Sequence, residues 1–275
     1  MTWNTNPLIA AALLFPTWAY LHGVMALWGR GGVGRGVSRR QVALYLGGMA
    51  ALFLALMSPI DGLGEELLSA HMIQHLLLIV VAPPLLVVGT PPTIFLWVLP
   101  MTTRRRVGRW WGRSSLLAPV WRWLSGALPA WLIHAAAVWL WHIPVVYEAA
   151  VVDPFVHLLE HASFLLTALL FWHVVLPRDR SRYLLGALLI FTTALHSSIL
   201  GALMTFSSRV WYPIYVERAP VWGLTALEDQ QLAGLLMWIP AGVVYLIAAL
   251  ALIGSWLNAA DRAEQVYQHA TRDLR

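Results

Sequence analysis

The sequence predicts an all-α fold, a single polytopic membrane bundle of seven transmembrane helices over residues 1–275. Hydrophobic residues make up 59% of the chain and charged residues only 11%, which is far from the balance of a soluble domain. Apolar runs of about 20 residues, long enough to cross a bilayer, recur along the whole chain. Sixteen tryptophans suit the interfacial belts that anchor such helices.

The apolar runs predict where each helix crosses the bilayer. The expected spans are about 7–28, 42–59, 67–89, 128–147, 155–176, 183–206 and 231–257. The first is interpreted as a spanning helix and not a signal peptide, because it lacks a basic start and a small-residue cleavage site. The third run continues to about residue 101, and we expect Pro83-Pro84 and Pro91-Pro92 to break it into a kinked helix and a short interfacial piece. No repeat or long linker divides the chain, so we expect one domain.

The arginines predict the orientation of the bundle. All but Arg209 and Arg218 fall in segments that seven spans place on one side, namely 29–41, 99–127, 177–182 and the tail after 258. Acidic residues gather on the other side. By the positive-inside rule the N-terminus is outside and the C-terminus is cytoplasmic. The net charge of +5 is thereby explained by topology, and no nucleic-acid partner is expected.

Two connecting segments have a composition of their own. Residues 104–123 mix arginine with tryptophan and are expected to lie along the cytoplasmic headgroups. Residues 207–230 are rich in tyrosine and tryptophan, and we expect them to form an outer loop that caps the bundle.

Two pairs of histidines share one spacing. His71 and His75 stand at positions i and i+4 near the start of an apolar run, and His157 and His161 repeat this arrangement. Residues at this spacing lie about 6 Å apart on one face of a helix. Ionisable groups inside a membrane are costly and usually functional. The plainer alternative is that these histidines only form hydrogen bonds between helices.

A rise of about 1.5 Å per residue converts sequence position into depth and brings several donors to one outer layer. The candidate metal ligands are His71, His75, His157, His161, His142, Asp229, Met237 and Met204. For the methionines the alternative is packing, and for Asp229 it is a helix cap. For His142 the alternative is that it satisfies backbone groups freed by Pro144. Imidazole and thioether donors without thiolate suit copper, while zinc suits imidazole with carboxylate. The absence of cysteine fits an oxidising outer face, and Glu160, Gln230 and Gln231 are expected to orient the imidazoles.

Three blocks of sequence carry a family resemblance. Residues 71–75 (HMIQH) with the following 82–91, residues 157–161 with Phe171-Trp172, and residues 229–238 together resemble the seven-helix CtaG family of cytochrome c oxidase assembly factors. The resemblance implies a non-enzymatic protein of the bacterial cytoplasmic membrane that binds copper near the outer face and passes it to an oxidase subunit. It implies His71, His75, His157 and His161 as ligands, with Asp229 and Met237 as further candidates. A homo-oligomer is left open.

Two other functions remain open from the residues alone. Paired transmembrane histidines also hold b-type haem in electron-transfer proteins. His161 and His173 would lie about 18 Å apart along one helix, but His134 and His142 only about 12 Å apart along another, which disfavours two parallel haems but allows one outer haem. The third class is a transporter or a scaffold, and the lack of an evident inverted repeat disfavours a transporter.

Overall fold

The computed structural model describes residues 3–91, 93–113, 117–176 and 182–272, and over these residues the regular structure is entirely helical. The elements are α1 (Pro7–Gly31), α2 (Arg39–Met57), α3 (Pro59–Glu66), α4 (Leu68–Leu76), the π-helix η1 (Leu77–Val81), α5 (Ala82–Gly89), η2 (Ile94–Val98), α6 (Met101–Arg113), α7 (Leu117–Leu124), α8 (Ala127–Trp141), α9 (Pro144–Val152), α10 (Pro154–Val175), α11 (Tyr183–Thr205), η4 (Pro213–Tyr215), η5 (Ala219–Trp222) and α12 (Ala226–Arg272). The all-α prediction is confirmed.

Six helical segments of the described chain are long and apolar enough to cross a membrane. They are Pro7–Gly31, Arg39–Met57, Leu68–Gly89, Pro154–Val175, Tyr183–Thr205 and Ala226–Ala259, close to six of the seven predicted spans. A seventh is reached only if α7 and α8, which are bent by 72° against each other, count as one. The described residues therefore support six or seven spans by length and composition, where seven were predicted.

The predicted span over residues 128–147 is shorter than expected. Helix α8 ends at Trp141 and the chain resumes as α9 at Pro144, with His142 in the break. The cause is local, since proline has no backbone N–H to donate and disfavours a helical conformation in the residue before it. Residues 144–147 therefore belong to a short separate helix.

The helix that we expected Pro83-Pro84 to kink does not end at these prolines. These prolines follow the π-helix inside the span and have no N–H to donate, and the Ile79 carbonyl one turn before them accepts from Trp172 Nε1 at 2.9 Å instead. The five-residue π-helix before them joins α4 to α5, so that Leu68–Gly89 forms one span. The helix does end at Gly89, before Pro91, and the short helix η2 follows where a short separate piece was predicted. Pro92 lies outside the described residues.

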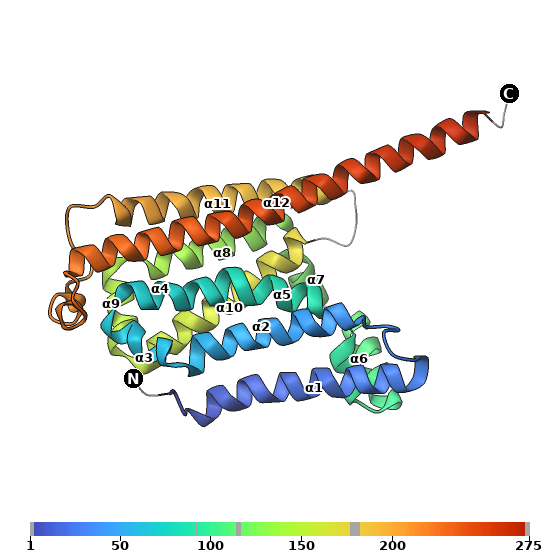
Figure 1. Ribbon diagram of the computed structural model, residues 1–275. Helices are drawn as coiled ribbons and strands as arrows, with labels where there is room; N and C mark the ends of the chain where they lie inside the picture. The colour runs from blue at the N-terminus through green and yellow to red at the C-terminus, as the bar shows by residue number, and fades with distance from the viewer. Residues whose placement is uncertain (1–2, 92, 114–116, 177–181, 273–275) are drawn as a thin grey trace.

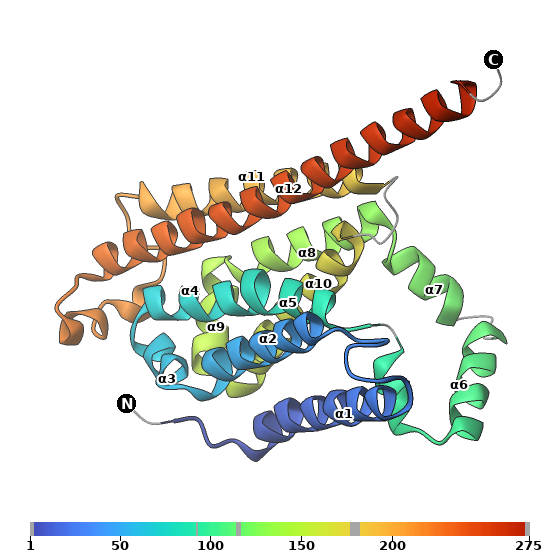
Figure 2. The same cartoon turned by 45° about the vertical axis from the view of Figure 1, so that its right-hand side comes forward.

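The helices pack as an elongated bundle (Figures 1 and 2) with α4, α5 and α10 in its middle. Helices α11 and α12 run side by side along one flank, and α1 lies at the opposite edge. One core cluster joins α10 to α8, α11 and α12 around Phe171 and Trp172, and another joins α1, α2 and α5 around Tyr20 and Tyr45. The central helices are thereby held from both sides.

The two ends of the bundle differ. The α1–α2 connection and helices α6 and α7 lie at one end, and α3, α9 and the segment between α11 and α12 lie at the other (Figures 1 and 2). Two of the arginine-rich segments therefore share an end, and the histidines of α4 lie toward the opposite end. Residues 177–181 of a third arginine-rich segment lie outside the described residues.

Candidate metal centre

Helix α4 carries the first pair of histidines on its interior face. His71 and His75 are 2% and 4% exposed, respectively, and their ring centroids lie 4.4 Å apart, as i,i+4 spacing predicts. Between them Gln74 turns toward α2 and α3, donating hydrogen bonds to the Ala55 carbonyl and to Asp61 Oδ1, both at 2.9 Å. The HMIQH stretch thus presents two imidazoles to the interior and an amide to its neighbours.

Helix α10 brings the second pair to the same place. Its N-cap Asp153 accepts two backbone N–H bonds from the first turn and fixes where the helix starts. His157, Glu160 and His161 consequently fall in the first two turns, and Glu160 and His161 face α4. Glu160 is fully buried, which is exceptional for a carboxylate.

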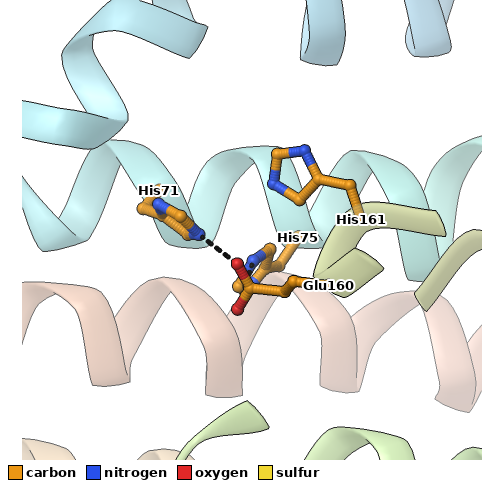
Figure 3. Close-up of side chains that lie close together, drawn as sticks. All are labelled: His71, His75, Glu160 and His161. Atoms are coloured by element: carbon orange, nitrogen blue, oxygen red, sulfur yellow. Dashed lines mark ion pairs between the residues drawn. The ribbon is translucent and has the colours of Figure 1, made fainter. Parts of the chain in front are cut away.

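Four side chains of these two helices form a compact group. His71, His75, Glu160 and His161 each offer one ligand atom, and these atoms all lie within 4.8 Å of one another. Glu160 Oε2 lies 3.3 Å from His71 Nε2, and its Oε1 lies 3.5 Å from His75 Nε2. Figure 3 shows the carboxylate between the two imidazoles of α4, with His161 beside them. We call these four residues the buried group.

Many polar atoms of the buried group have no hydrogen-bond partner within the part of the chain that the structure describes. They are His71 Nε2, both ring nitrogens of His75, His161 Nε2 and both oxygens of Glu160. The His–Glu contacts above have ion-pair distances but not hydrogen-bond geometry. Buried polar atoms are nearly always paired, because leaving them unpaired costs free energy. Three imidazoles and a carboxylate converging in this way fit the coordination of a copper or zinc ion.

His157 lies beside the buried group but belongs to a second one. Its ring centroid is 4.1 Å from that of His161 and 5.4 Å from that of His71. Its ligand atom is grouped with Asp61 of α3 and with His161, again within 4.8 Å. The structure therefore brings all four predicted histidines of α4 and α10 together, in two overlapping groups.

His142 lies next to this arrangement, in the break between α8 and α9. Its Nδ1 lies 2.7 Å from the Val138 carbonyl, an arrangement that leaves Nε2 as the acceptor or ligand atom. Its ring centroid is 5.8 Å from that of His75. The residue thus satisfies a carbonyl at the end of α8, its Nε2 has no partner among the described residues, and it lines the same cavity as His75.

The predicted methionines take different positions. Met237 lines a cavity of about 30 Å³ together with His75, His142 and Met72, a space sufficient for one or two water molecules. Met204 is fully buried in a core cluster with Met72, Tyr147 and Tyr212, against which Met237 also packs. Met237 is therefore close to the histidines, whereas the surroundings of Met204 are those of a packing residue.

Asp229 is fully buried at the start of α12, but its carboxylate bonds to the first turn of α4. It accepts hydrogen bonds from the backbone N–H groups of Leu68, at 2.7 Å, and Ser69, at 3.1 Å. The first N–H groups of a helix have no intrahelical partner, so Asp229 caps α4. Helix α12 has a cap of its own, in which the Thr225 N–H donates to the Glu228 carboxylate and the Glu228 N–H donates to the Thr225 hydroxyl. Ligation by Asp229 stays a prediction.

Sequence reasoning missed two contributions. Glu160 was expected to orient imidazoles from outside the site, yet its carboxylate lies among the ligand atoms. The sequence feature that could have indicated this is a carboxylate within an apolar run. Asp61 lies on the short helix α3, almost a hundred residues before His157 in sequence. Nothing in its local pattern indicates that it reaches α10, because only the folded chain brings these helices together.

The segment between α11 and α12 closes the bundle at this end. Tyr215 donates to the Gly64 carbonyl at 2.8 Å, and Tyr212 donates to the His142 carbonyl at 2.9 Å. Tyr147 pairs with the Tyr215 hydroxyl at 2.8 Å. Burial raises the pKa of Tyr212 and of Tyr215 above the ordinary value, so both hydroxyls stay protonated donors at neutral pH. The prediction that this loop caps the bundle is confirmed.

Taken together, the fold and site define a multi-pass membrane protein with a buried group of imidazoles and a carboxylate near one end of a helix bundle. Over residues 18–259 the sequence matches the family described as cytochrome c oxidase caa3 assembly factor (Caa3_CtaG), and the chain belongs to this family. The resemblance found in the three sequence blocks is thereby confirmed.

Relatives among curated proteins come from mycobacteria. Uncharacterised proteins of Mycobacterium bovis and Mycobacterium tuberculosis are each 28% identical over 98% of this chain. One of Mycobacterium leprae is 24% identical over 94% of it. The chain covers only 40–42% of the length of these relatives. No solved structure matches the chain.

Proposed function

We propose that this chain binds copper in the buried group and passes it to a subunit of cytochrome c oxidase during assembly of that enzyme. The observation that carries the proposal is the convergence of His71, His75, Glu160 and His161, whose ligand atoms lie within 4.8 Å of one another and are largely without hydrogen-bond partners among the described residues. The role is that of a non-enzymatic carrier, in keeping with the description of the family.

The donor set supports copper as the cargo. Imidazole nitrogens bind copper in either oxidation state, and the thioethers of Met72 and Met237 beside His75 suit the reduced ion. The chain contains no cysteine, so copper would be held by imidazole and thioether donors and not by thiolate. Imidazole ligands exchange one at a time, and transfer to a partner's histidines then needs no net redox change. Zinc is the competing ion for three imidazoles and a carboxylate.

The orientation that we propose places the buried group toward the extracytoplasmic side. The arginine-rich α1–α2 connection and helices α6 and α7 share the opposite end of the bundle, the end that the positive-inside rule assigns to the cytoplasm. The N-terminus is then outside and the C-terminus inside. The capping loop with Tyr212 and Tyr215 would be the surface that meets the oxidase subunit.

A cellular experiment tests the proposed function. His71→Asn with His75→Asn is expected to abolish the activity and the copper content of the served oxidase in cells whose own copy of the gene is deleted, while the variant still inserts in the membrane. His134→Asn is the matched control, because His134 is equally buried and bonds Thr167 on a neighbouring helix at 3.1 Å, away from the buried group. Full oxidase activity in the double variant would contradict the proposal.

A b-type haem remains the second candidate, and the geometry favours the ion. Glu160 lies between the imidazoles of His71 and His75, whose centroids are 4.4 Å apart. The adjoining cavity of about 30 Å³ is small beside the roughly 300–1,000 Å³ of pockets for larger ligands. An absorption spectrum of the purified protein separates the candidates, since bound haem gives a strong Soret band and copper held by imidazoles does not.

A further inference from the structure

A second group of potential ligands adjoins the buried group. It consists of Asp61 on α3 with His157 and His161 on α10, and one ligand atom from each lies within 4.8 Å of the others. His161 is the only residue that the two groups share. We call Asp61, His157 and His161 the outer group.

The two groups differ in their access to the surroundings. All four members of the buried group are buried, whereas Asp61 and His157 are only partly buried. Asp61 belongs to the short helix at the end of the bundle, and His157 lies one turn closer to that end than His161. An ion approaching the buried group from this end therefore meets Asp61 and His157 first.

The outer group is held in place by its own contacts. Asn4 donates to Asp61 Oδ2 at 2.7 Å, and Gln74 donates to Asp61 Oδ1 at 2.9 Å. These bonds orient the carboxylate and leave further lone pairs on each oxygen. His157 Nε2 is buried without a hydrogen-bond partner among the described residues. Gln74 lies between His71 and His75 in sequence and so ties the outer group directly to the helix of the buried group.

We propose that the outer group is a separate receiving position for copper, from which the ion moves to the buried group by ligand exchange about His161. This inference rests on the proposed function. In the transfer, His161 stays bound while Asp61 and His157 are replaced by His71, His75 and Glu160. Copper exchanges bonds to oxygen and nitrogen for other bonds to oxygen and nitrogen, so its oxidation state does not change. A carboxylate and an imidazole near the surface bind weakly and release readily, and the larger buried set retains the ion.

The test separates the rate of loading from the affinity at equilibrium. Full-length protein in detergent is mixed with copper bound to a coloured chelator, and the transfer is followed by stopped flow and then at equilibrium. Asp61→Asn keeps an acceptor oxygen for Gln74, and His157→Gln keeps polarity. Each is expected to slow loading by about tenfold or more, with the amount of copper retained at equilibrium close to wild type.

Glu65→Gln is the matched control, because it removes one negative charge from an exposed residue of the same short helix and is expected to load at the wild-type rate. Suppose that Asp61→Asn and His157→Gln load at the wild-type rate while His71→Asn still loses copper at equilibrium. The receiving position is then overturned and the proposed function stands. If the wild-type chain retains no copper, the proposed function and this inference both fail. Equal slowing by Glu65→Gln also overturns the inference, since the effect would then be general electrostatics.

Discussion

Glu160 is the residue on which the chemistry of the site depends most. Glu160 is fully buried in an apolar bundle, where an ionised carboxylate is costly unless hydrogen bonds, an opposite charge or a bound cation compensate it. Its neighbours are the imidazoles of His71 and His75, at 3.3 and 3.5 Å, and the buried group contains no arginine. In the proposed function the carboxylate supplies negative charge to the incoming copper ion, a role that histidines bonding helices together would not need.

Asp229 provides a residue-scale test that separates positioning from ligation. Asp229→Ala leaves the N–H groups of Leu68 and Ser69 without their acceptor, and we expect it to lower the free energy of unfolding by about 1–3 kcal/mol. Thermal unfolding in detergent, followed together with copper affinity, is the measurement.

Asp229→Asn sharpens this comparison, because an amide keeps one acceptor oxygen for the cap but no negative charge. As a helix cap, Asp229 should tolerate this change with a smaller loss of stability and with copper affinity near that of wild type. A large loss of copper affinity in Asp229→Asn without a change in unfolding temperature would instead identify Asp229 as a ligand.

At the scale of elements, the close packing of α3 on α4 sets the position of the site. Gly64 permits this packing, because a Cβ built there would lie 2.5 Å from Gln74 Oε1 and 3.4 Å from His71 Nδ1. Gln74 cannot simply move aside, since it is buried and bonded to Ala55 and Asp61. A methyl group at position 64 would therefore displace Gln74 or move α3 away from α4.

Gly64→Ala is accordingly expected to destabilise the protein by about 1–3 kcal/mol through overpacking and to weaken copper binding by displacing His71. Gly62→Ala on the same helix is the control, because a Cβ there meets no atom within 4 Å. Chemical unfolding and a copper titration of both variants check the expectation. Equal behaviour of the two variants would show that the α3–α4 contact does not position the histidines.

Element by element, the sequence predicted most of what depends on local pattern. Apolar length located six spans within a few residues, and i,i+4 spacing placed His71 with His75 and His157 with His161. The break at His142 was not predicted, because the apolar run continues through Pro144 and the expected span 128–147 crossed it. Asp229 as the cap of α4, and Asp61 beside His157, were not predictable, because each contact joins helices that are distant in sequence and meet only after folding.

For the whole molecule, the proposed orientation can be measured directly. The chain has no cysteine, so single cysteines can be introduced as reporters without removing any. Glu217→Cys in the capping loop is expected to react with a membrane-impermeant maleimide in intact cells. Arg35→Cys in the α1–α2 connection is expected to react only after lysis, because both positions are exposed but lie at opposite ends of the bundle. The reverse pattern would place the histidines on the cytoplasmic side.

The central claim is that imidazoles from α4 and α10 hold one copper ion between them, and metal analysis of the purified protein tests it most directly. Wild-type chain, His71→Asn with His75→Asn, and the control His134→Asn are each loaded with copper, freed of unbound metal by gel filtration, and assayed for copper per chain. We predict that wild type and control retain copper equally and that the double variant retains none. Equal retention by the double variant, or none by the wild type, would contradict the account.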